Sequence, residues 1–145
     1  MEACLRLEPG NASAHYILGN FYYTANDHTR AIAHYSKAQE LFPGDPLIYF
    51  SRGNVYRDSG NLQAALADFS EAIRLQPEYV DAYNNRGSIY LSLNELDAAL
   101  YDFSRVISFN PDYALAYYNR GLVYLQQEKY QQAEEDFTQA LVKNP

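Results

Sequence analysis

The sequence predicts an all-α fold made of consecutive helix-turn-helix units. Its main feature is a fixed period that runs through the whole chain, and internal repetition at this scale is typical of helical arrays. Two residue types mark the period most clearly. Five of the six prolines share one register: Pro9, Pro43, Pro77, Pro111 and Pro145. Four glycines share another: Gly19, Gly53, Gly87 and Gly121.

Each unit is predicted to contain two helices. In the third copy, Tyr83, Gly87 and Tyr90 lie at helical spacing on one side of a first helix, and Ala99 and Phe103 lie at similar spacing on a second. The register proline cannot continue a helix, so it ends each second helix. First helices are expected at residues 12–25, 46–59, 80–93 and 114–127. Second helices are expected at residues 29–41, 63–75, 97–109 and 131–143.

The recurring glycine predicts a close crossing of the two helices in each unit. Glycine inside a helix costs about 1 kcal/mol relative to alanine, so its return in every copy indicates that close backbone approach outweighs this cost. Large aromatic residues are expected to fill the space around the crossing. In the first copy these are Tyr22 and Tyr35.

These columns resemble the tetratricopeptide repeat over nearly the whole chain. The family pattern places an aromatic, Leu-Gly, Tyr, Ala, Phe, Ala and Pro within a 34-residue helix-turn-helix unit. The third copy matches it at Tyr83, Gly87, Tyr90, Ala99, Phe103, Val106 and Pro111. The leucine before glycine is kept only as Leu18, and the first aromatic is tyrosine or His15. The resemblance implies a right-handed α-α superhelix, a solenoid whose concave groove binds a peptide or partner protein without catalysis.

A single domain spanning residues 1–145 is expected. Its predicted parts are the end of a preceding repeat at 1–11 and four repeats at 12–45, 46–79, 80–113 and 114–145. The chain stops on the register at Pro145 without a polar capping helix, which solenoids need for solubility. We therefore expect a fragment of a longer repeat protein, or free repeat ends that associate between molecules.

Composition narrows the range of partners. The 145 residues are 48% hydrophobic and carry a net charge of −7, which argues against a nucleic-acid partner and favours a basic or flexible one. No apolar run reaches the length of a membrane span, so no membrane partner is expected. Cys4 is the only cysteine, which fits a reducing compartment and favours a cytoplasmic location.

No catalytic residue, metal ligand set or cofactor is predicted. The three histidines, His15, His28 and His34, lack metal-ligand spacing, and no Gly-rich phosphate loop is present. His15 is expected to substitute for a core aromatic. Cys4 has no linked histidine that could activate it as a nucleophile.

A column of arginines predicts structural ion pairs. Each has an aspartate sixteen positions later: Arg52 and Asp68, Arg86 and Asp102, Arg120 and Asp136. The first copy has Leu18 and His34 instead, so both positions change together. We expect each arginine to bond the aspartate of its own repeat, with its stem packed on the hairpin. The alternative is a row of guanidinium groups that bind a ligand carboxylate.

The opposite face of the first helices is the candidate peptide groove. It mixes aromatic side chains, which supply contact area, with amides that donate and accept hydrogen bonds. The candidates are Tyr16, Asn20, Tyr23, Phe50, Asn54, Arg57, Asn84, Asn85, Ser88, Tyr118, Asn119 and Leu122. Two alternatives are solvated asparagines and aromatics packed between neighbouring first helices.

Two family binding modes fit the sequence poorly. Asn85 and Asn119 resemble the asparagine ladder of some tetratricopeptide superhelices, but Ser51 and Ile17 interrupt it. The family's carboxylate clamp for chaperone C-termini needs lysine on this face. The column of its first lysine holds Tyr16, Phe50, Asn84 and Tyr118. The expected function is a protein-binding scaffold; the alternatives are a self-assembly unit or a targeting domain of a larger enzyme.

Overall fold

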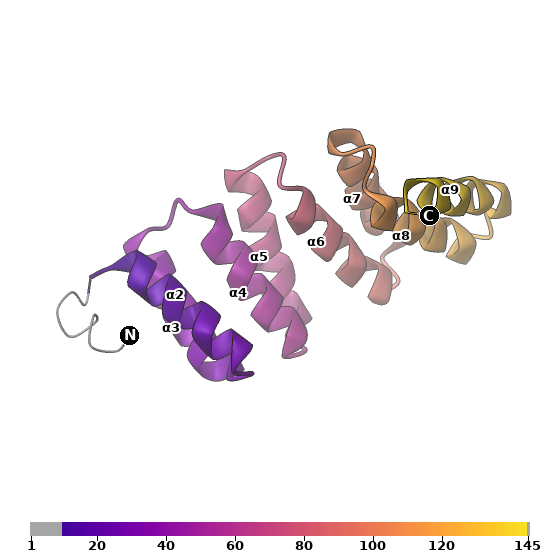
Figure 1. Ribbon diagram of the computed structural model, residues 1–145. Coiled ribbons are helices and arrows are strands. Elements are labelled where there is room, and N and C mark those ends of the chain that lie inside the picture. Colours follow the sequence, from indigo (N-terminus) through magenta and orange to yellow (C-terminus); the bar gives the residue numbers. More distant parts are fainter. Residues whose placement is uncertain (1–9, 145) are drawn as a thin grey trace. The chain divides into compact units, whose positions relative to one another are not determined.

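The computed structural model describes residues 10–144, which form eight helices and no strand (Figure 1). These helices divide into two compact units that meet in sequence at Pro77 and Glu78. Each unit holds two helical hairpins and is described by itself. The single domain expected from the sequence stays a prediction, and the proposed end of an earlier repeat lies largely outside the described residues.

The first unit contains two hairpins joined by a short loop. Its helices are α2 (Ala12–Thr24), α3 (His28–Leu41), α4 (Pro46–Asp58) and α5 (Leu62–Leu75). Helix α2 pairs with α3 and α4 pairs with α5, while α4 also packs on α3. The core of the first hairpin therefore includes Ile48 and Val55 from the next one, together with Leu18, Tyr35 and Ala38.

The second unit repeats this arrangement. Its helices are α6 (Val80–Ser92), α7 (Leu96–Phe109), α8 (Ala114–Gln126) and α9 (Tyr130–Lys143). Helix α6 pairs with α7, α8 pairs with α9, and α8 packs on α7. Val123 of α8 joins Ala99 and Phe103 in the buried core of the preceding hairpin.

The helix boundaries follow the repeat closely. Every first helix ends one residue earlier than the sequence predicts, and every second helix begins one residue earlier. The turns between paired helices explain the earlier ends of the first helices, because one residue in each turn has a positive φ, which a continuing helix cannot adopt. These residues are Asn26, Gly60, Asn94 and Glu128.

Glycine marks the crossing of the two helices in each hairpin. A Cβ added at Gly53 would lie 2.9 Å from Cε1 of Phe69, and one at Gly87 would lie 3.0 Å from Cε1 of Phe103. Both rings are fully buried. The first helix therefore rests its backbone directly on an aromatic ring of the second, as the glycine register predicts.

The two units differ in how their helices begin. All four helices of the first unit have an Asn or Asp side chain that accepts a hydrogen bond from a backbone N–H in the first turn: Asn11, Asp27, Asp45 and Asn61. None of the four helices of the second unit has such a bond. Helix α9 has the least favourable start, because Lys129 places a positive charge beside the positive end of the helix dipole.

We expect Lys129→Asp to stabilise the second unit by about 1 kcal/mol, since an aspartate at this position supplies the missing cap and suits the helix dipole. Urea unfolding followed by circular dichroism measures the change. The matched control is Lys129→Ala, which removes the positive charge without adding a cap. Equal stability of the two variants would show that no capping bond forms.

Candidate peptide-binding faces and the framework behind them

Three arginine–aspartate pairs tie the two helices of a hairpin together. In each pair the Nε and Nη2 atoms of arginine donate to the two carboxylate oxygens of the aspartate sixteen positions later, at 2.7–2.8 Å. The pairs are Arg52 and Asp68, Arg86 and Asp102, and Arg120 and Asp136. Each guanidinium group is therefore bonded to a carboxylate of its own repeat. These bonds support the structural role over the alternative, in which the arginines bind a ligand carboxylate.

Two of the three arginines also reach the preceding hairpin of the same unit. Arg52 donates from Nη1 to Oγ of Ser36 at 2.9 Å, and Arg120 donates from Nη1 to Oγ of Ser104 at 3.3 Å. One side chain thus joins three helices. This second contact was not expected from the sequence, which pointed only to the aspartate within the repeat.

Burial makes these pairs sensitive to the loss of a partner. The Asp102 side chain is 1% exposed, and burial raises the pKa of its carboxyl although the hydrogen bonds from Arg86 act in the opposite direction. For Arg52 and Arg120, the hydrogen bonds to aspartate are the largest influence and raise the pKa of the guanidinium. Every one of the three arginines also lies near two tyrosine rings, with its guanidinium carbon 5.5–5.9 Å from the ring centroids.

The first hairpin replaces the ion pair by a histidine cluster. Leu18 is buried at the arginine position. The ring of His34 stacks on Tyr22 at 5.3 Å, and its Nδ1 lies 3.1 Å from Nδ1 of His15. His34 stands at the position where the other repeats have aspartate, and His15 stands where they have tyrosine. The two histidines contact each other.

In the first unit, part of the predicted groove joins neighbouring first helices. The hydroxyl groups of Tyr16 and Ser51 lie 3.2 Å apart and connect α2 to α4. Tyr35 donates its hydroxyl to Oδ1 of Asn20 at 2.5 Å, and burial raises the pKa of Tyr35. Tyr16 and Asn20 are thus bonded within the protein, in line with the alternative that groove aromatics pack between helices.

A charged cluster lies at the end of the same two helices. Tyr23 donates to Oδ2 of Asp58 at 2.5 Å, and Arg57 donates to its Oδ1 at 2.9 Å. Burial raises the pKa of Asp58, but the bonds from Tyr23 and Arg57 outweigh it and lower the pKa overall. Asp58 is therefore an ionised carboxylate on this face, a residue that the groove prediction did not include.

The other two candidates of the first unit are Phe50 and Asn54 of α4. Phe50 is half-buried, with its ring centroid 5.8 Å from that of Phe69, so it supports the hairpin core. Asn54 is half-buried and lies one helical turn further along the same helix.

In the second unit, asparagines make the link between first helices. Asn84 is 6% exposed, and its Oδ1 accepts a hydrogen bond from Nδ2 of Asn119 at 3.4 Å. Nδ2 of Asn84 also donates to Oδ1 of Asn85 at 3.5 Å. Ser88 bonds back to the carbonyl of Asn84 at 2.8 Å. Asn84 is thus a buried connecting residue, whereas Asn85, Ser88 and Asn119 stay partly exposed.

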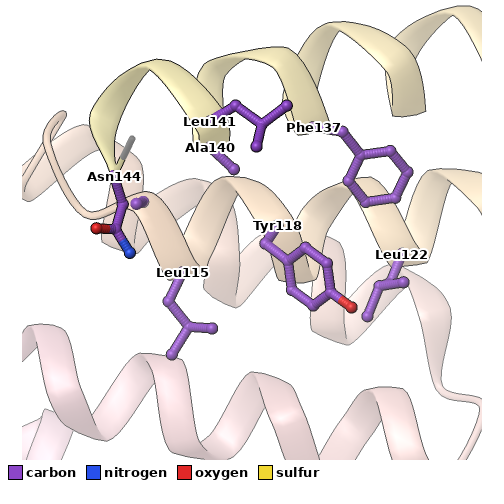
Figure 2. Close-up of a pocket in the computed structure, with 8 residues that line it drawn as sticks. Leu115, Tyr118, Leu122, Phe137, Ala140, Leu141 and Asn144 are labelled. Carbon is purple, nitrogen blue, oxygen red and sulfur yellow. The ribbon is translucent and has the colours of Figure 1, made fainter.

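Tyr118 and Leu122 line a different feature, an apolar pocket at the end of the second unit. The pocket is lined by Leu115, Tyr118 and Leu122 of α8 and by Phe137 and Leu141 of α9 (Figure 2). Tyr118 is 49% exposed and its ring lies 5.8 Å from that of Phe137. The sequence placed these two residues in the groove because it showed their helix face and not the position of that face at the end of a unit.

Residues 10–144 contain no group of three or more His, Cys, Asp or Glu side chains placed to hold a metal ion. Within the same range, no helix is both long and apolar enough to span a membrane.

Tandem helical hairpins with glycine crossings and an amide-rich first-helix face define a class of helical-repeat scaffolds. Family models described as tetratricopeptide or TPR repeats match residues 1–46, 53–93, 87–128 and 114–145. The chain belongs to the tetratricopeptide repeat family. Its fold is that of a protein–protein interaction scaffold, and repeats of this family are generally non-catalytic modules that commonly bind peptides or proteins.

Solved structures support this assignment. The chain is similar to the crystal structure of MamA, with a TM-score of 0.94 and 29% identity over 98% of this chain and 83% of the other. A tetratricopeptide repeat protein from Parabacteroides merdae is also 29% identical, with a TM-score of 0.85 over 92% of this chain and 53% of the other.

A third similar structure contains a ligand. The first TPR domain of Spaghetti (RPAP3), bound to the HSP90 peptide SRMEEVD, is 25% identical, with a TM-score of 0.77 over 81% of this chain and 93% of the other. No match is found among curated protein sequences.

Proposed function

We propose that each unit of the chain binds an extended segment of a partner protein on the exposed face of its own first helices. The observation that carries this proposal is the division of these helices into two sides. One side carries the glycine and the arginine that build the hairpin, and the other carries partly exposed amides and charges. The residues best placed for contact are Tyr23, Asn54 and Arg57 in the first unit, and Asn85, Ser88 and Asn119 in the second.

The chemistry of this face favours a segment that is not acidic. Asp58 is ionised beside Arg57 and offsets its charge, and the chain as a whole is acidic. The amides of Asn54 and Asn85 can pair with the backbone of an extended peptide whatever its side chains. No lysine stands at the clamp column. The acidic peptide SRMEEVD, which is bound in the Spaghetti structure, is therefore expected not to bind here.

A peptide array probed with the intact chain tests the proposal. Asn54→Ala, Arg57→Ala and Asn85→Ala remove groove groups without entering the hairpin core, whereas Tyr16 and Phe50 are unsuitable because they contact Tyr35 and Phe69. We expect at least a tenfold loss of array signal, which corresponds to about 1.4 kcal/mol.

The matched control for this array is Tyr101→Ala, which removes an exposed aromatic from α7 on the other helix of a hairpin. Tyr101→Ala should bind as the unchanged chain does. Equal signals from the groove variants and this control would contradict the proposal, and so would binding of SRMEEVD.

A further inference from the structure

The apolar pocket at the end of the second unit corresponds to a face that is covered elsewhere in the chain. One period earlier, Phe103 and Val106 occupy the positions of Phe137 and Ala140 and are fully buried, because α8 packs over them. Val123 of α8 lies in the core beside Phe103. At the end of the unit none of the described helices of the second unit covers this face, and Leu141 is 71% exposed.

The first unit shows the same interface a second time. Helix α4 packs over α3, where Val55 and Ile48 join the core around Tyr35 and Ala38. Both interfaces therefore follow one rule: the first helix of a hairpin inserts an apolar side chain, Val55 or Val123, against the aromatic ring of the preceding hairpin. This rule defines the kind of helix that fits against Phe137.

Helix α2 of the same chain presents that kind of surface. Phe21 lies one period before Val55, and Ile17 lies one period before Ser51. Val55 and Ser51 are buried by the preceding hairpin, but Phe21 and Ile17 are 51% and 50% exposed. The first unit thus exposes an apolar covering helix, and the second unit exposes an uncovered apolar pocket.

We propose that a second copy of the chain docks its α2 into this pocket, head to tail, with Phe21 against Phe137 and Leu141. The contact continues the interface already made by α4 on α3 and by α8 on α7. It uses different surfaces on the two copies, so it leaves one free surface of each kind on every assembly and can add further copies. The inference does not depend on peptide binding by the first-helix face.

The proposed contact differs from the internal interfaces in one respect. Arg52 and Arg120 bond a serine of the preceding hairpin, but the equivalent residue of α2 is Leu18, and Thr138 stands at the serine register. The joint therefore lacks the arginine–serine bond of the internal interfaces. We therefore expect association to depend on apolar burial and to persist at high salt, where exposed ionic contacts are screened.

Sedimentation velocity of the full chain across a concentration series tests the proposal. The unchanged chain should show assemblies that lengthen with concentration. Phe21→Glu removes the covering surface and Leu141→Glu disrupts the pocket, and each variant alone should remain monomeric at every concentration because it retains only one competent surface. An equimolar mixture of the two variants should form a dimer and nothing larger.

Three results would overturn the proposal. They are a monomeric unchanged chain at all concentrations, self-association of either single variant, and a mixture that stays monomeric. Tyr101→Glu, at an exposed aromatic of α7, should associate as the unchanged chain does. Circular dichroism verifies that all three variants fold. Phe21→Glu should keep its peptide-array signal, so failure of the groove proposal and failure of this one are distinguishable.

Discussion

Asp102→Ala is expected to destabilise the second unit by about 3–5 kcal/mol, the range measured when one partner of a buried ion pair is removed. The Arg86 guanidinium would lose both hydrogen bonds to the carboxylate, at 2.7 and 2.8 Å. Its charge would remain among the rings of Tyr83 and Tyr90. Since most single substitutions cost far less, the effect should be evident as a large fall in the urea midpoint.

Two comparisons separate this mechanism from general damage. Replacing both partners, Arg86→Met with Asp102→Leu, should recover most of the loss, because a buried pair is often exchangeable for apolar groups of similar volume. Glu71→Ala breaks the exposed pair with Arg74 and should change stability by less than about 0.5 kcal/mol. If the double variant were as unstable as Asp102→Ala, the uncompensated charge of Arg86 could not be the cause of the destabilisation.

The position of the pair within the array sets the size of the effect. Arg120 and Asp136 have the same bond geometry but lie in the last described hairpin, and their side chains are more exposed than those of Arg86 and Asp102. We therefore expect Asp136→Ala to follow the same direction with a smaller loss. The two losses should differ because each hairpin of a repeat array is stabilised only by its neighbours, and the hairpin of Asp136 is the last one described.

The sequence predicted well those features that lie within a single hairpin. Helix ends, the glycine crossing and the constant spacing of arginine and aspartate are local, because a single turn joins the two helices. The proline register made these features visible, since it fixes where each hairpin ends. The exchange of arginine and aspartate for Leu18 and His34 was visible for the same reason.

Contacts between neighbouring first helices were much harder to predict. Tyr16 and Ser51, Tyr23 and Asp58, and Asn84 and Asn119 are all separated by 35 residues, one more than the period. Helical periodicity tells which side chains share a face, but burial on that face depends on how adjacent hairpins are rotated. The recurring offset of one residue reflects this rotation, which the repeat pattern of the sequence does not show.

Gly19→Ala is expected to cost about 2 kcal/mol, because it overpacks a closed helix crossing. A Cβ at Gly19 would lie 2.6 Å from both Cδ1 and Cε1 of Tyr35, which is closer than real side chains approach. The ring of Tyr35 is fully buried, and its hydroxyl is fixed by the bond to Asn20, so it cannot move aside. Overpacking typically costs about 1–3 kcal/mol, and so close an approach belongs at the upper end of that range. The better helix propensity of alanine returns about 1 kcal/mol.

Substitutions at two other glycines test whether this loss comes from the helix crossing. Gly44→Ala lies in a loop where an added Cβ meets nothing within 4 Å, so its effect should be within about 0.5 kcal/mol. Gly121→Ala would meet Phe137 at 2.7 Å, but that ring is only half-buried beside the open pocket and can shift, so the loss should be smaller than at Gly19. Equal losses at Gly19 and Gly44 would contradict the close crossing, and equal losses at Gly19 and Gly121 would contradict the role of ring burial.

If a second copy covers Phe137 as proposed, the cost of Gly121→Ala should rise with protein concentration, because the docked helix would hold that ring in place.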